Sequence, residues 1–343
     1  MKIVFSERHR RYQPRFDIVN GKVAETASPY TNADWVHAAV ERDLGGPFLE
    51  PVDHGMAPLN ALHDPGYVDL LRTAWADWAS IHGSEGEAIP LASVQRGMEP
   101  RIPICIDGKL SYYALDLGTP ITEGTWDAIY ESAQVALTAA DVVSGGDRAA
   151  YALARPGGHH AGRDYYGGYC FLSTEGLAIE RLRTLGADRV AYLDVDYRHC
   201  NGTQSLFYQR SDFLVVSLHC DPHYDYPYFS GYEDEHGAGA GVGATLNLPM
   251  SPGTGWSTYA GALDRAVAAV RSFKADALVV LLGVDTFHDD AISQFSLTRE
   301  AYPRIGERIA SLGPPTVFVK GGGYCRESLD RCVTDTLLGF LNG

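Results

Sequence analysis

The feature that most constrains the fold of this chain is a repeated alternation of short apolar runs with longer segments of helical periodicity. Six apolar runs predict strands buried on both faces, because they do not alternate with polar residues. These runs are Lys2–Phe5, Ala149–Ala154, Val190–Val195, Phe213–Leu218, Ala277–Leu282 and Thr316–Val319. Strands that alternate with helices predict an α/β fold with a mostly parallel sheet.

Four segments between these runs have the apolar spacing of helices. They are Trp126–Val143, Glu175–Leu185, Tyr259–Phe273 and Arg299–Leu312. We expect Thr174 and Ser257 to cap the second and third of them. Glycines follow three of the predicted helices, at Gly145, Gly186 and Gly313, where the chain is expected to turn.

Residues 81–124 interrupt this alternation, because they are rich in glycine, proline and polar residues and have no strong period. A stretch of this length without regular structure is usually functional or disordered. Its apolar pieces, Ile102–Ile106 and Tyr112–Tyr113, favour order. We therefore expect an ordered insertion over the active face or at a subunit contact.

The net charge and the cysteine content indicate which binding partners and which cellular compartment to expect. With 28 Lys and Arg against 43 Asp and Glu, the net charge of −15 argues against binding nucleic acid and suits a cationic ligand. No run approaches the roughly 20 apolar residues of a membrane span, and the first residues lack an apolar signal core. Six cysteines without a CxxC pair are expected to be reduced thiols, so we predict a cytoplasmic protein without a membrane partner.

Five of the predicted strands end in polar residues that carry chemistry. The segments that follow them are Arg155–His160, Asp196–Gly202, His219–Asp221, Gly283–Asp285 and Lys320–Tyr324. Because ligands of open α/β sheets bind beyond the carboxyl ends of the strands, these side chains are expected to meet at one site.

These segments resemble the histone deacetylase superfamily, and in particular its bacterial acetylpolyamine amidohydrolases. The stretches that carry the resemblance are Arg155–Ala161, Gly167–Phe171, Asp194–Gln204, Ser217–His219 and Gly283–Thr286. The resemblance spans nearly the whole chain. It implies a single three-layer domain of the arginase/deacetylase fold over residues 1–343, with an insertion at about 81–124 that pairs two subunits as a homodimer and narrows the channel.

The resemblance implies zinc-assisted hydrolysis of an amide on a small acylated amine. In that family a histidine pair handles protons and a tyrosine stabilises the oxyanion. His159 and His160 match the histidine pair, and His160 matches the general base. Asp194 and Asn201 match the respective partners of these histidines, and Tyr324 matches the oxyanion tyrosine.

The zinc ligands match only in part. Asp196 and Asp285 match two of them, but Arg198 stands where the family has a histidine ligand. A guanidinium group stays protonated and has no lone pair for a metal. Its charge about 4 Å from a metal ion would cost roughly 4 kcal/mol even at an effective dielectric constant of 20.

Three interpretations of Arg198 are open at this point. The guanidinium group could fill the metal site and pair with Asp196 and Asp285, which would make a metal-free family member. Alternatively, His199 or Cys200 could replace the lost ligand beside the two aspartates. In the third interpretation the two aspartates and water hold a metal weakly and some hydrolysis persists.

The resemblance also assigns residues around this centre. Tyr169 and Tyr226 match aromatic walls of the substrate channel, and Asp107 matches an acidic residue that meets the distal ammonium group of a polyamine. A structural potassium ion would bind the side chains of Asp194 and Ser217. Its other ligands would be the carbonyl groups of Asp196, Arg198 and Leu218, since oxygen ligands suit a hard cation.

The leading interpretation is therefore an amidohydrolase that acts on an acetylpolyamine-like substrate by metal-assisted attack of water. The alternative is a metal-free protein in which Arg198 fills the zinc site, either as a binding protein or with a different, for example anionic, substrate. Histidines outside these motifs, such as His63 and His223, are expected at the surface or in loops.

Overall fold

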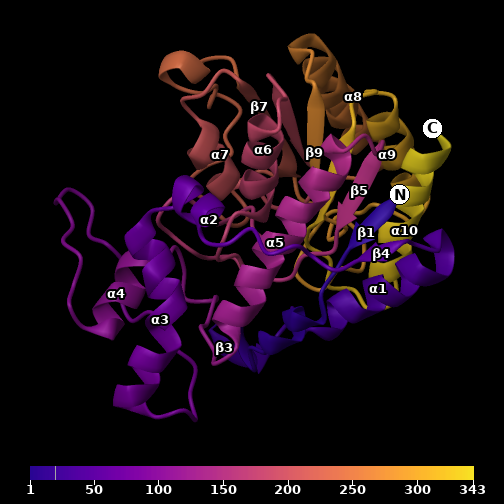
Figure 1. The fold of residues 1–343 in the computed structure, drawn as a ribbon. Helices are drawn as coiled ribbons and strands as arrows, with labels where there is room; N and C mark the ends of the chain where they lie inside the picture. The colour runs from indigo at the N-terminus through magenta and orange to yellow at the C-terminus, as the bar shows by residue number, and fades with distance from the viewer. Residues whose placement is uncertain (20) are drawn as a thin grey trace.

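A computed structural model describes residues 1–19 and 21–343, and its main element is an eight-stranded sheet in which every neighbouring pair is parallel. The strand order is β4-β1-β5-β10-β9-β6-β7-β8. Figure 1 shows this sheet among the helices of the whole ribbon. The strands are β1 (Lys2–Val4), β4 (Phe48–Leu49), β5 (Ala149–Ala152), β6 (Val190–Asp194), β7 (Phe213–Cys220), β8 (Thr245–Met250), β9 (Ala277–Leu282) and β10 (Thr316–Lys320). All six predicted strands are present, and the predicted parallel α/β fold is confirmed.

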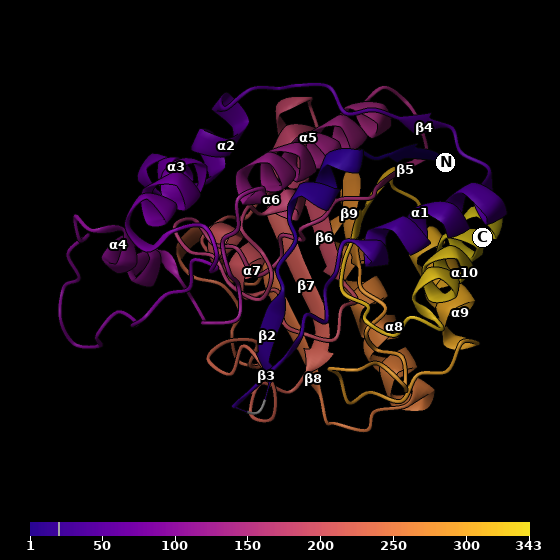
Figure 2. The same ribbon diagram turned by 90° about the horizontal axis from the view of Figure 1, so that it is seen from below.

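Helices cover both faces of the sheet and make the fold three layers thick (Figure 2). They are α1 (Thr31–Leu44), α2 (Ala57–Leu62), α3 (Pro65–His82), α4 (Ile106–Tyr113), α5 (Thr125–Ser144), α6 (Thr174–Thr184), α7 (Asn201–Phe207), α8 (Trp256–Phe273), α9 (Ala301–Ala310) and α10 (Leu329–Asn342). One core cluster joins the sheet to α5 and α6, and a second joins it to α1, α8, α9 and α10. Side chains of successive strand residues alternate between the two, since Ala150 and Ala152 belong to the first and Tyr151 to the second.

The four predicted helices are present, but the two predicted caps were wrong. Ser173, and not Thr174, caps α6, because the Ser173 hydroxyl accepts a hydrogen bond from the Gly176 amide at 3.1 Å. Ser257 lies inside α8, which begins one residue earlier and follows Gly255 in an extended conformation. A serine or threonine near a helix start is a common signal, and only the backbone direction decides which residue is the cap.

Residues 81–124 project from the body of the molecule, as both ribbon views show (Figures 1 and 2). An antiparallel bridge between Ala88 and Ile121 closes the base of this segment, and α4 gives it one regular element. Residues 91–103 form an irregular loop beside α4.

A hairpin of β2 (Phe16–Val19) and β3 (Lys22–Glu25) forms a separate small sheet.

Among the helices found in residues 1–19 and 21–343, none is both long and apolar enough to cross a membrane.

Candidate active site

The carboxyl ends of four neighbouring strands bring most of the predicted site residues together. His159 and His160 follow β5, Asp194 ends β6, Asp285 follows β9 and Tyr324 follows β10. A narrow cavity of about 40 Å³ lies between these strand ends. Residues from the loops after β5 and β10, including His159, Tyr169, Lys320, Gly322 and Tyr324, line this cavity.

The two histidines lie side by side, with ring centroids 4.0 Å apart, but each has a different partner. His159 Nδ1 donates to Asp194 Oδ2 at 3.0 Å, and His160 Nδ1 donates to Asn201 Oδ1 at 2.6 Å. Burial alone would lower the pKa of His159, but Asp196 and Asp194 outweigh it and raise the pKa to about 9. Burial and the neighbouring His159 charge hold the pKa of His160 well below its ordinary value.

One histidine is therefore an imidazolium ion near neutral pH, while the other is neutral. Because the His160 Nδ1–H bond points at the Asn201 oxygen, its other ring nitrogen carries the free lone pair. A pair of titratable groups whose pKa values are pushed apart is typical of acid–base sites.

Tyr324 is the third chemical group of the site. Its backbone N–H donates to Asp290 Oδ2 at 2.8 Å, which fixes the loop after β10. Burial, followed by the charges of Asp285 and Asp196, raises the pKa of the Tyr324 hydroxyl well above its ordinary value. The hydroxyl therefore keeps its proton and is a hydrogen-bond donor.

Tyr169 and Tyr226 form aromatic walls beside the histidines. The Tyr226 ring meets the His160 ring edge-on at a centroid distance of 4.9 Å, and the Tyr169 ring lies 6.2 Å from the Tyr324 ring. Tyr169 has a positive φ of 64°, which is rare for a residue with a side chain and is often found at functional sites.

The insertion holds both walls through a carboxylate that the sequence did not single out as functional. Asp116 Oδ2 accepts from the Tyr226 hydroxyl at 2.8 Å and from the Gly168 amide at 2.6 Å. Its other oxygen accepts from Thr119 at 3.1 Å, and the Thr119 hydroxyl oxygen accepts from the Tyr169 amide at 3.0 Å. Asp116 therefore fixes the positions of Tyr169 and Tyr226.

The two predicted metal-ligand aspartates are buried next to each other. Asp196 Oδ1 accepts from the Arg198 amide at 3.1 Å, and its Oδ2 accepts from the Gly322 amide at 2.7 Å. Asp285 Oδ1 accepts from the Tyr197 amide at 3.0 Å, whereas its Oδ2 is buried and accepts no hydrogen bond. Burial and the Asp196 charge raise the pKa of Asp285, and Arg198 opposes that rise.

Arg198 points its guanidinium group into this acidic region. Its Nη1 lies 3.8 Å from Asp285 Oδ2, and its Nη2 lies 3.6 Å from Asp225 Oδ1 and donates to the carbonyl of Ile292. The side chain is only 15% exposed. Burial would lower the pKa of Arg198, but Asp225 and Asp285 raise it further above its already high ordinary value, so the group is a permanent cation.

These residues do not make a zinc site. In the part of the chain that the structure describes, no three His, Cys, Asp or Glu side chains are grouped to hold a metal. Of the carboxylate oxygens of Asp196 and Asp285, the one that accepts no hydrogen bond among the described residues is Asp285 Oδ2. It already faces a guanidinium nitrogen, and a metal bound there would lie beside that charge.

Neither proposed substitute ligand is directed at the two aspartates. The ring nitrogens of His199 are 3.2 Å from Ser230 Oγ and 3.0 Å from Gln204 Oε1. The His199 ring packs on His219, and burial lowers its pKa well below the ordinary value. Cys200 is fully buried in the core cluster on the α5–α6 side of the sheet. Rebuilding a metal site with either residue would require both the side chain and the backbone to turn.

The predicted potassium ligands lie at the ends of β6 and β7. Both Asp194 oxygens accept hydrogen bonds, Oδ1 from the Asp196 amide at 2.9 Å and Oδ2 from His159 and Tyr192. The Ser217 hydroxyl lies 2.8 Å from His219 Nδ1, and Leu218 is buried in the core. The potassium site stays a prediction.

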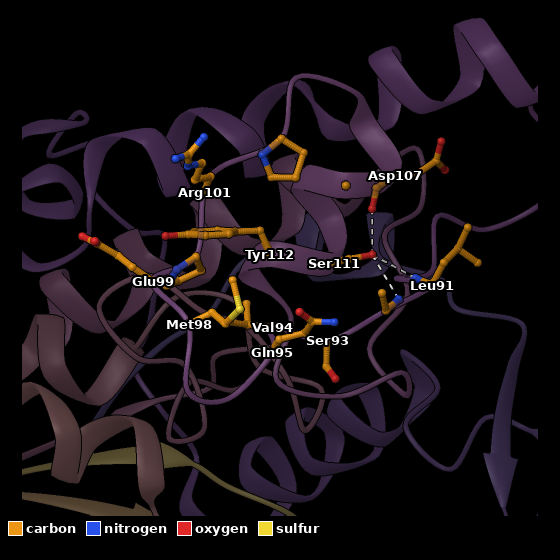
Figure 3. A pocket seen from close by; sticks show the side chains of 14 residues that line it. Leu91, Ser93, Val94, Gln95, Met98, Glu99, Arg101, Asp107, Ser111 and Tyr112 are labelled. Atoms are coloured by element: carbon orange, nitrogen blue, oxygen red, sulfur yellow. Dashed lines mark hydrogen bonds between the residues drawn. The ribbon is translucent and has the colours of Figure 1, made fainter.

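Asp107 lies apart from these residues. It belongs to α4, where its carboxylate is 3.0 Å from His82 Nε2, and it lines a cavity of about 470 Å³ in the insertion. This cavity has Leu91, Val94 and Met98 of the loop facing Ser111 and Tyr112 of α4 (Figure 3). Within one chain, Asp107 is not part of the cavity that contains His159 and Tyr324.

Sequence reasoning missed three hydrogen-bond acceptors around the site, namely Asp116, Asp225 and Asp290. Asp225 could have been suspected, because it directly precedes Tyr226, which the resemblance had assigned to the substrate channel. Asp116 and Asp290 stand in segments without a periodic pattern, and nothing in the sequence reveals their partners.

The parallel sheet with a histidine pair, two aspartates and a tyrosine at its carboxyl edge defines a deacetylase-type protein. Residues 34–340 match the histone deacetylase domain, so the chain belongs to this family.

Its similarity is high to acetylpolyamine amidohydrolases. The chain is 45% identical to acetylpolyamine amidohydrolase 1 of Pseudomonas aeruginosa and 40% identical to that of Mycoplana ramosa, with 99% of each chain covered in both cases. The crystal structure of the acetylpolyamine aminohydrolase of Burkholderia pseudomallei has a TM-score of 0.94 at 38% identity, and the match covers 99% of this chain and 98% of that one.

Proposed function

We propose that this chain is a deacetylase-like amidohydrolase that acts on a small acylated amine. The observation that carries the proposal is the pair of oppositely tuned histidines, His159 on Asp194 and His160 on Asn201, beside the protonated Tyr324. The names and full-length similarity of the relatives support an acetylpolyamine-like substrate.

In this proposal each side chain of the site has its own role in the reaction. Neutral His160 takes a proton from water and later returns it to the leaving amine. The Tyr324 hydroxyl and the His159 imidazolium ion stabilise negative charge on the acyl oxygen. Tyr169 and Tyr226 hold the methylene chain of the substrate between them and exclude water.

In the family zinc polarises the acyl carbonyl, but the residues present here do not fit a zinc ion. We expect turnover to depend on the side-chain donors Tyr324 and His159.

A second candidate function is supported by the position of Arg198. It faces Asp285 and Asp225 where a metal ligand is expected, while His159 and His160 are still hydrogen-bonded to Asp194 and Asn201. The protein would then bind an acylated amine or an anionic analogue of it without hydrolysing it.

The first experiment compares three proteins on N-acetylputrescine: the unmodified chain, His160→Gln and His223→Gln. Release of acetate by the unmodified chain and by the His223→Gln control is expected. His223 lies in an exposed loop, where its side chain contacts Asp221 and Tyr232. His160→Gln should be slower by at least about 100-fold, since it removes the base.

Calorimetric titration of the same proteins with N-acetylputrescine separates the two functions. Binding without any acetate release would support the binding protein. Equal rates for His160→Gln and the control would contradict the amidohydrolase mechanism.

We also propose that two copies of the chain pair through the insertion. The loop and its flanks carry highly exposed apolar side chains, including Leu91 at 78%, Met98 at 71% and Ile104 at 95% exposure. Large apolar patches of this kind usually mark contact surfaces. Pairing there could bring Asp107 of one chain toward the channel of the other.

We place the protein in the cytoplasm, because all six cysteines are free and five of them are buried.

A further inference from the structure

One oxygen of Asp116 accepts hydrogen bonds from two groups that both pack on the ring of His160. These groups are the amide of Gly168, at 2.6 Å, and the hydroxyl of Tyr226, at 2.8 Å. A side-chain carbon on Gly168 would lie 2.2 Å from Cδ2 and 3.0 Å from Nε2 of His160, so the Gly168 backbone lies directly against the imidazole. The Tyr226 ring meets the same imidazole edge-on at 4.9 Å, and Asn201 accepts from its Nδ1. Asp116 Oδ2 therefore fixes two of these three neighbours of the ring.

The backbone holds Asp116 close to this wall of the channel. The Leu115 amide donates to the Tyr166 carbonyl at 2.7 Å, and the Tyr166 amide donates to the Tyr113 carbonyl at 2.9 Å. A side-chain carbon on Gly167 would lie 2.7 Å from Leu115 Cβ and 2.8 Å from Asp116 Oδ2, so the two segments are in close contact. The end of the insertion is thus joined to the wall through both its backbone and the Asp116 side chain.

The hydrogen bonds of Asp116 require a carboxylate and not an amide. Its Oδ1 accepts from the Gly118 amide at 2.8 Å and from the Thr119 hydroxyl at 3.1 Å, in addition to the two bonds at Oδ2. Burial, followed by the Asp116 charge, raises the pKa of Tyr226 well above its ordinary value, so the hydroxyl keeps its proton and donates. An asparagine of the same shape has one acceptor oxygen, and its NH₂ group would face the N–H of either Gly118 or Gly168.

We propose that Asp116 is a positioning residue for His160, which it acts on through Gly168 and Tyr226. It fixes the orientation of the imidazole ring and, with it, the direction of the Nε2 lone pair. The inference rests on the proposed function only where it treats His160 as the base. The insertion, which projects from the body of the molecule, thereby contributes to the geometry of the acid–base site.

The test follows the His160 ring directly and compares five proteins. They are the unmodified chain, Asp116→Asn, Tyr226→Phe, the double variant and the control Glu123→Gln, which removes a charge from an exposed residue of the same insertion. NMR of isotope-labelled histidine side chains reports the hydrogen bond of the ring, and the His160 signal is identified by its absence in His160→Gln. The kcat and KM on N-acetylputrescine are measured for the same proteins.

In Asp116→Asn the Nδ1–H signal of His160 should shift, because the ring is free to turn away from Asn201. Its kcat should be about 10- to 100-fold lower, as for a base held out of position, while KM changes by less than about threefold. Tyr226→Phe loses one of the two hydrogen bonds and should lie between Asp116→Asn and the unmodified chain.

The double variant should resemble Asp116→Asn, because both substitutions break the same contact. Glu123→Gln should match the unmodified chain in both measurements.

An unchanged His160 signal in folded Asp116→Asn would overturn the inference, even if the melting temperature or kcat fell. A shifted signal with an unchanged kcat in an active chain would overturn it as well. Circular dichroism checks the fold, and where Asp116→Asn does not fold, Tyr226→Phe decides by the same two measurements.

The ring signal also separates this inference from the proposed function. An unmodified chain that releases no acetate, with a shifted signal in Asp116→Asn, would contradict the proposed function and leave the placement of His160 by Asp116 standing. Acetate release that depends on His160, with an unchanged signal in Asp116→Asn, would support the proposed function and overturn the inference.

Discussion

At the scale of single residues, the chemistry of this site depends on Arg198. A neutral imidazole at this position would offer a lone pair, whereas the guanidinium group offers only donors and a fixed charge. Its Nη2 donates to the Ile292 carbonyl group and lies 3.6 Å from Asp225 Oδ1, so the positive charge of the arginine is paired inside the site. The neighbouring histidines are still hydrogen-bonded to their partners, His159 to Asp194 and His160 to Asn201.

Gly168 provides a second test at this scale. Its φ is +54°, and a side-chain carbon there would lie 2.2 Å from Cδ2 of the His160 ring. Gly168→Ala should therefore push the His160 ring away from Asn201 and abolish acetate release. Gly146→Ala is the matched control, because Gly146 also has a positive φ, of 106°, but nothing lies within 4 Å of the added carbon.

The control should lose only about 1 kcal/mol of folding stability, the ordinary cost of a side chain at positive φ. Activity on N-acetylputrescine and urea unfolding are measured for both variants. A Gly168→Ala protein that keeps its activity would show that the His160 ring has room to move.

At the scale of secondary structure, the buried parallel strands were predictable and the irregular segments were not. β9 was predicted with both its ends correct, because a strand covered on both faces must be apolar throughout. β4, with two residues, and β8, with a proline and an asparagine, have no comparable signal. In the β2–β3 hairpin all of β3 is exposed and the buried residue of β2 is Asp17, so the pattern of its described residues does not reveal an apolar face.

For the site, too, residues next to buried strands were predictable, whereas residues in irregular segments were not. His159, His160, Asp194, Asp285 and Tyr324 follow strands directly, so the sheet itself brings them together, and the sequence could predict their proximity. Asp107 failed to join them within one chain, because it belongs to a helix of the insertion whose position depends on tertiary contacts. His63 was expected at the surface or in a loop. It lies in the loop between α2 and α3, but it is fully buried there, and its ring forms hydrogen bonds with two backbone groups.

The insertion loop provides a prediction at this scale. Ile104→Glu places a charge in the proposed subunit contact and should convert dimers to monomers, as measured by light scattering after gel filtration. Ile104 is 95% exposed in the single chain, so its replacement should not affect folding. The control is Val242→Glu, because Val242 is also highly exposed, at 70%, but lies outside the insertion. Dimers that persist in Ile104→Glu, or monomers in the unmodified chain, would contradict pairing through this loop.

At the scale of the whole molecule, buried neutral histidines link stability to pH. His63 Nδ1 donates to the Gly162 carbonyl at 2.7 Å, and its Nε2 accepts from the Ser173 amide at 3.1 Å, so the ring must be neutral. Burial lowers the pKa of His63 to about 4, against 6.5 in the unfolded chain. Between these values the unfolded state binds more protons, so folding stability falls as the pH falls from about 6.5 toward 4.

For His63 alone the expected loss at pH 5 is about 2 kcal/mol relative to pH 8. Urea unfolding at both pH values measures the total, and His63→Gln should flatten the dependence by this amount. A His63→Gln protein with the same dependence as the unmodified chain would show that the ring is not the group that titrates.

The strand order has a consequence for synthesis on the ribosome. β10 follows all the other described strands in the sequence, yet it lies between β5 and β9 in the middle of the sheet. Until residue 320 has left the exit tunnel, the nascent chain therefore carries two apolar, unpaired strand edges where the centre of the sheet will be. Such edges attract other strands and chaperones. Since Tyr324 and Lys320 arrive with the same strand, a chain that stops early would have no partly working site.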